Sequence, residues 1–229
     1  MPSLEPLVPI FEDSELTLES VRLEAGEELA LGDGEGDTLL FVHEGSATLV
    51  LPGGESALGP SAAGLVLAEE PGMLLAGAGG VAGVRATAGS GADRHAPLGS
   101  RETVARLDPA RADSATGSRS FQVLLGPHNG STRATMFVGF VPPGKAPWHY
   151  HLYDEIVWIP RGPGRLHVGE SIEDLGAGAA FRLRPRQVHI VENTSADAEL
   201  MLLGVFTPAG SPSAAYLAGE SAGEHRVTD

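Results

Sequence analysis

Cysteine is absent from this chain of 229 residues, so it offers no disulfide bond, no thiolate nucleophile and no thiolate metal ligand. Long apolar runs are also lacking, because no stretch of 18 apolar residues occurs that could cross a membrane as a helix. Residues 1–6 lack the basic and apolar regions of a secretory signal peptide. We therefore expect a cytoplasmic protein with no membrane partner.

Basic side chains are scarce. The chain has 15 Lys and Arg against 30 Asp and Glu, which gives a formal net charge of -15. This balance argues against nucleic-acid binding, because contacts with phosphates need clustered Lys and Arg. The acidic excess lies mainly in residues 1–115, and we expect it to favour solubility.

A sustained helical period is missing as well. Short apolar runs separated by glycine, of which there are 31, are typical of a sandwich or barrel of short strands. We expect strands at 121–125, 132–141 and 200–206. The pattern changes at 89–118, which we interpret as a linker in which residues 102–107 could form two helical turns.

Four potential metal ligands stand in two short stretches. His149 and His151 are two residues apart, so both imidazoles leave the same face of an extended strand, and Glu155 returns to that face. A neighbouring antiparallel strand could bring His189 to the same place. A metal site made of two or three imidazoles and one carboxylate, with open coordination positions, suits iron, manganese, nickel, copper or zinc.

These residues resemble the motifs of the cupin family. The run G-x4-H-x-H-x3-E-x6-G from Gly144 resembles the first cupin motif, shortened by one residue, and the run H-x3-N from His189 resembles the second. The resemblance implies one divalent metal, bound by His149, His151, Glu155 and His189. Where the second motif usually has P-x-G, this chain has Arg184-Pro185-Arg186, so the turn must form without its glycine.

A weak internal repeat sets the expected domain organisation. Gly26 and Gly45 are spaced almost as Gly144 and Gly162 are, but the first copy has no equivalent of the ligands. The expected fold is all-β, with two tandem cupin barrels of the jelly-roll (double-stranded β-helix) type. Residues 1–95 would form a barrel without metal ligands, 96–117 a linker and 118–229 the metal-binding barrel. The resemblance also implies a homodimer.

Other residues are candidates for binding a substrate. Arg182 and Arg184 alternate with apolar residues and share one strand face, so they either bind an anionic group or line an exposed edge. Arg133, on the strand before the ligands, is a second candidate for anion binding. Tyr153 could line the cavity, and Glu155 could act as a catalytic base.

The resemblance implies an enzyme, although the cupin fold hosts many activities. The ligand set is similar to that of quercetinase-like cupin dioxygenases. This similarity favours a metal-dependent oxidoreductase, a dioxygenase that acts on a small oxygenated organic substrate. The substrate could carry an anionic group. One alternative is a non-oxidative isomerase, lyase or hydrolase that uses the metal as a Lewis acid, for which zinc would suffice. Another is a cupin that binds a small molecule without turnover.

Overall fold

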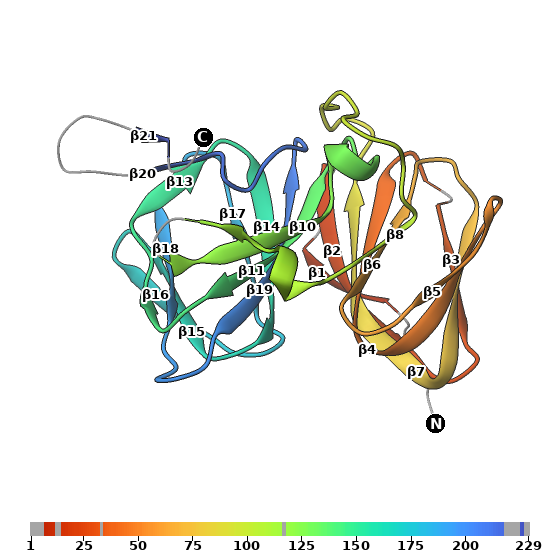
Figure 1. Ribbon diagram of the computed structural model, residues 1–229, viewed down its shortest axis with the longest axis horizontal. Coiled ribbons are helices and arrows are strands. Elements are labelled where there is room, and N and C mark those ends of the chain that lie inside the picture. Colours follow the sequence, from red (N-terminus) through yellow and green to blue (C-terminus); the bar gives the residue numbers. More distant parts are fainter. Residues whose placement is uncertain (1–6, 12–14, 33, 116–117, 218–224, 227–229) are drawn as a thin grey trace. The chain divides into compact units, whose positions relative to one another are not determined.

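The computed structural model describes residues 7–11, 15–32, 34–115, 118–217 and 225–226, and it is all-β (Figure 1). The chain divides into two compact units. The first comprises residues 1–107, 124–134 and 207–209, and the second comprises 108–123, 135–206 and 210–229. Within the described ranges, no helix has the length and apolar character to span a bilayer.

The first unit is built on one sheet with the strand order β1-β2-β7-β4-β6-β8, to which β3 is added beside β7 and β5 beside β4. Its strands are β1 (Leu7–Phe11), β2 (Leu16–Leu23), β3 (Glu28–Leu31), β4 (Asp37–Leu51), β5 (Gly54–Leu58), β6 (Ala62–Val66), β7 (Gly72–Ala88) and β8 (Val104–Arg106). Leucine and valine side chains such as Leu40, Leu49, Val66 and Leu74 fill its interior.

Strand β8 replaces the two helical turns that residues 102–107 suggested. Val104–Arg106 is extended and pairs antiparallel with β6, with Ala62 opposite Arg106. The helical interpretation was wrong because pairing at the edge of an existing sheet outweighs the weak local propensity of so short a segment.

The second unit consists of two antiparallel sheets. One has the order β17-β14-β19-β11-β10-β9, and the other has the order β16-β15-β18-β13-β20-β21 with β12 beside β18. Their strands are β9 (Asp113–Ser114), β10 (Ser120–Leu125), β11 (Thr135–Val141), β12 (Gly144–Lys145), β13 (His149–His151), β14 (Asp154–Arg161), β15 (Gly164–Val168), β16 (Ser171–Leu175), β17 (Ala180–Leu183), β18 (His189–Asn193), β19 (Leu200–Thr207), β20 (Ala215–Leu217) and β21 (His225–Arg226).

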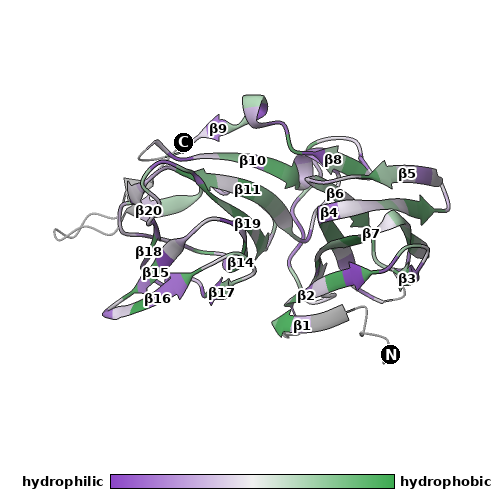
Figure 2. Cartoon of the chain, turned by 90° about the horizontal axis from the view of Figure 1, so that it is seen from below, coloured by the Kyte–Doolittle hydropathy of each residue, from purple (hydrophilic) through white to green (hydrophobic). Residues whose placement is uncertain are grey.

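Strands β11 and β19 are central in the first of these sheets, and every residue in them is buried. Figure 2 shows β11 as largely hydrophobic and the edge strand β16 as largely hydrophilic. In the register of β11 and β19, Phe137 faces Gly204 and Leu202 faces Gly139, so each large side chain lies beside a glycine. Each glycine thus makes room for the large side chain of its partner, which a Cβ atom at the glycine would meet.

Candidate metal centre

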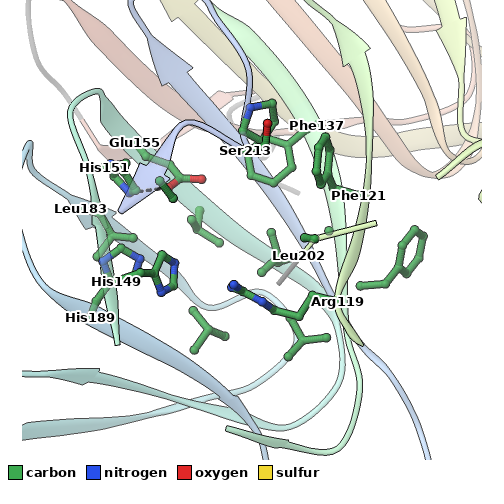
Figure 3. Close-up of a pocket in the computed structure, with 18 of the residues that line it drawn as sticks. Arg119, Phe121, Phe137, His149, His151, Glu155, Leu183, His189, Leu202 and Ser213 are labelled. Atoms are coloured by element: carbon green, nitrogen blue, oxygen red, sulfur yellow. Dashed lines mark ion pairs between the residues drawn. The ribbon is translucent and has the colours of Figure 1, made fainter. Parts of the chain in front are cut away.

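The four predicted ligands lie together inside the second unit. Antiparallel pairing of β13 with β18 places His149 directly opposite His189, while His151 ends β13 and Glu155 lies near the start of β14. All four side chains are buried, with exposed fractions of 8 % or less, and all four line one cavity (Figure 3). The strand geometry inferred from the sequence thus brings these residues to one place.

Each of the three imidazoles is held by a backbone carbonyl at Nδ1. His149 Nδ1 lies 2.8 Å from the oxygen of Pro147, His151 Nδ1 lies 2.9 Å from that of Tyr153, and His189 Nδ1 lies 2.8 Å from that of Gln187. A carbonyl can only accept a hydrogen bond, so the proton of a neutral ring sits on Nδ1 and Nε2 keeps its lone pair. Metal-binding histidines are commonly oriented in this way.

His151 and Glu155 form the closest pair. His151 Nε2 lies 2.9 Å from Glu155 Oε2, yet this buried nitrogen has no hydrogen-bond partner among the described residues. A buried imidazole nitrogen without a hydrogen-bond partner, next to a carboxylate oxygen, is a pair of donors that a bound cation would satisfy. The donor set therefore fits a metal ion.

His149 and His189 are held in the neutral form that a metal requires. Burial, with smaller contributions from the charges of His189, Arg119 and His151, lowers the pKa of His149 to about 3. Burial also lowers the pKa of His189 to about 4. Both rings are therefore uncharged at neutral pH, and their lone pairs are available.

The ligands are not yet gathered around a single point. The rings of His149 and His189 pack on each other with centroids 4.4 Å apart, and His189 lies 5.2 Å from His151. Across the described part of the chain, no group of three or more His, Asp or Glu side chains is arranged to hold an ion as it stands. Metal binding would thus require these side chains to move so that their donor atoms face one common point.

The cavity has a volume of about 110 Å³ and mostly apolar walls. Its polar lining consists of the four candidate ligands with Arg119, Ser120 and Ser213. Its other lining residues are Ala115, Phe121, Phe137, Gly139, Phe140, Val141, Tyr153, Val157, Leu183, Val191, Leu202, Pro212 and Ala215.

Tyr153 lines this cavity and supports a ligand. Its ring stacks on that of His151, with centroids 4.1 Å apart and an interplanar angle of 6°, and it also stacks on Phe206. Burial raises the pKa of Tyr153 well above its usual value, so the phenol keeps its proton, which it donates to the carbonyl of Pro212. Tyr153 thereby connects His151 to the segment after β19.

The three arginines that the sequence suggested for substrate binding are absent from the described lining of the cavity. Arg182 and Arg184 both bind Asp154, at 2.6 Å and 2.8 Å from Oδ2. Arg133 is buried in the first unit, where Nη1 donates to the carbonyl of Gly89 and Nε lies 3.6 Å from Asp37. These positions correct the sequence interpretation, because each of the three is held by a partner outside the cavity.

Arg119 is the arginine that lines the cavity, and sequence reasoning missed it. It belongs to no motif, and only its position directly before the apolar strand β10 hinted at a role.

Gly204 is a second functional residue that sequence reasoning missed. A Cβ atom at Gly204 would collide with the ring of Phe137 and lie 2.6 Å from Glu155 Oε1, so this residue keeps the space that the carboxylate occupies.

Two neighbours of His189 explain how its strand is held. The amide of Asn193 donates to the carbonyls of Val141 and Ala198, both at 2.7 Å, and its Oδ1 accepts from the backbone of Ser195. Arg186 stands where the second cupin motif has glycine, and its φ of 66° lies in the left-handed region. The turn therefore keeps the glycine conformation without the glycine.

Replacing Arg186 by glycine is expected to stabilise the protein by about 0.5–1 kcal/mol, because relief of the left-handed strain exceeds the added entropy of the unfolded chain. Urea unfolding of the metal-free protein measures this difference. Arg186→Ala keeps the strained backbone, so it should remain near the wild type. An equal gain in both variants would mean that the arginine side chain, and not φ, is the unfavourable element.

Comparison with known proteins supports the fold. Residues 136–206 match the model of a Cupin domain. Comparison with curated protein sequences gives no match. Similar solved structures include a mutant of oxalate decarboxylase from Bacillus subtilis, with 14% identity and a TM-score of 0.69 over 86% of this chain and 70% of that one.

Two further structures cover most of both chains. AerE from Microcystis aeruginosa has 14% identity and a TM-score of 0.68, over 88% of this chain and 96% of that one. A Cupin 2 conserved barrel domain protein from Leptotrichia buccalis has 11% identity and a TM-score of 0.63, over 88% of each chain. The predicted all-β fold class is confirmed, and the similarity to these cupin structures is consistent with tandem cupin barrels.

Proposed function

We propose that this protein, in which residues 136–206 match a cupin domain, is a metal-dependent enzyme, and more specifically a dioxygenase that acts on a small oxygenated organic molecule. One observation carries the proposal: three imidazoles with Nδ1 held by carbonyls and one carboxylate are buried around a single cavity. His149, His151, His189 and Glu155 would hold one divalent ion. Iron, manganese, nickel or copper would suit oxygen chemistry.

When bound, the metal would polarise oxygen atoms of the substrate and, if redox-active, provide electrons for reaction with O2. The chain's own residues supply the surroundings. The apolar walls around Phe137, Val157 and Leu202 exclude water, which strengthens electrostatic interactions inside the cavity. Oε2 of Glu155 faces His151, so we assign to Oε1 the role of accepting a proton from a substrate hydroxyl group.

A non-oxidative reaction is the second candidate, because the similar structures include an oxalate decarboxylase. The same residues could hold a metal that acts only as a Lewis acid, as in a lyase, isomerase or hydrolase. The mainly apolar walls favour a substrate with a hydrocarbon part.

Oxygen consumption separates the two candidates. The protein reconstituted with Fe²⁺ or Mn²⁺ should consume O2 with at least one member of a panel of small hydroxy and keto acids, and His151→Ala should not. An oxygen electrode measures uptake, and the same panel under argon, followed by product analysis, detects non-oxidative turnover. Turnover that is equally fast without O2 would contradict the dioxygenase and support the second candidate.

A further inference from the structure

Among the described residues that line the cavity, Arg119 is the one cationic side chain, and it lies opposite the candidate ligands. Figure 3 shows this side chain extending into the pocket toward the imidazoles of His149 and His189. Arg119 lies directly before β10, and Phe121 two residues later lines the same cavity.

The charges of the occupied site would not balance without an anion. Glu155 is the one carboxylate among the described residues that line the cavity, whereas a divalent ion bound there would bring two positive charges. Excess charge in a buried, mostly apolar cavity is unfavourable unless a ligand of opposite sign compensates it. A carboxylate or enolate meets this requirement and also offers oxygen atoms to a metal.

The apolar walls of the cavity limit the size and chemistry of the part of the ligand that does not carry the charge. Phe121, Phe137, Phe140, Val141 and Leu202 offer hydrocarbon contacts and no hydrogen bonds from their side chains. A dry cavity of about 150 Å³ holds benzene. The volume of about 110 Å³ here is smaller, so it favours a short branched aliphatic group over a six-membered ring.

We propose that Arg119 determines substrate specificity, and that the substrate is a small organic anion with a carboxylate or enolate at Arg119 and an apolar body against the phenylalanine and leucine walls. This inference deepens the function proposed above and rests on it. It moves anion recognition from Arg182 and Arg184, which bind Asp154 outside the cavity, to an arginine that lines the same cavity as the candidate ligands.

Two matched pairs of probes test the proposal: isobutyrate with isobutyramide, and benzoate with benzamide. Each pair has the same shape and differs in charge. Dissociation constants are measured by NMR titration of the Zn²⁺-loaded protein, which is diamagnetic, and of the metal-free protein. At least one anion should bind about tenfold or more tightly than its amide, because an ionised partner strengthens hydrogen bonds to a guanidinium.

Arg119→Gln should weaken binding of that anion by about 10- to 100-fold, leave binding of the amide unchanged and not weaken binding of Zn²⁺. Arg119→Lys should restore part of the loss, because it keeps the charge but not the planar fork. The exposed Arg165, paired with Asp174 outside the cavity, gives the control Arg165→Gln, which should bind like the wild type.

Unchanged anion affinity in Arg119→Gln, or equal affinity for acid and amide, would overturn the proposal. A loss in Arg184→Gln with none in Arg119→Gln would also overturn it and return anion binding to Arg184, directly after β17. Failure of the metal proposal is distinguishable from failure of the Arg119 proposal, because in the first case the protein would bind no Zn²⁺. The metal-free titrations would still show whether Arg119 selects the anion.

Discussion

Replacing His151 by alanine is expected to weaken metal binding by more than about 100-fold while leaving the protein folded. Even residues that only support a ligand change metal affinity by about 10- to 100-fold, so loss of a ligand should exceed that range. His151 is also the imidazole ligand paired with the carboxylate ligand. Its Nε2 lies 2.9 Å from Glu155 Oε2 and has no hydrogen-bond partner in the described part of the chain. Titration with Mn²⁺ measures affinity, and circular dichroism checks the fold.

His167→Ala is the matched control for this prediction. His167 is also buried in the second unit, but its Nε2 binds Glu192 at 2.7 Å and it is absent from the described lining of the cavity. The variant should therefore lose some stability and keep the metal. Full metal affinity in His151→Ala, or an equal loss in both variants, would contradict the ligand assignment.

Replacing Gly204 by alanine is expected to disrupt the site from β19, the strand next to β14, which carries Glu155. The new methyl group would meet the ring of Phe137 and lie 2.6 Å from Glu155 Oε1, so one of the two side chains must move. Inserting a methyl group into such a core costs about 1–3 kcal/mol. A displacement of about 1 Å at a reacting group can cost about 100-fold in rate. We therefore expect lower stability together with an activity loss on that scale.

Urea unfolding and turnover of the metal-loaded enzyme measure these two effects. Gly176→Ala is the control, because a Cβ atom there meets nothing within 4 Å and its backbone is not in the left-handed region. A Gly204→Ala variant with wild-type stability and turnover would show that the space beside Phe137 and Glu155 is not needed.

The sequence was sufficient to predict the all-β fold and the place where the four candidate ligands meet. Both depend on regular geometry: residues two apart share a strand face, and short apolar runs between glycines form strands. The sequence also indicated that an antiparallel neighbour could bring His189 to the same place, and the structure pairs it with His149. In these respects local pattern and tertiary structure agree.

The arginines show where the pattern was misread. Phe181 and Leu183 on β17 are buried, and Leu183 lines the cavity, so Arg182 and Arg184 point to the other face. The alternation already implied this, because the apolar face of a strand packs on the core. Arg119 could not be found in the same way, since nothing near it in the sequence indicates that its side chain enters the cavity.

Metal content tests the central claim most directly. Elemental analysis of the protein, reconstituted with Fe²⁺, Mn²⁺, Ni²⁺ or Cu²⁺ and freed of excess metal, should find about one ion per chain. The double variant His149→Ala/His189→Ala, prepared in the same way, should contain none. Absence of metal from the intact protein, or an equal content in the double variant, would contradict a metal centre built from these residues.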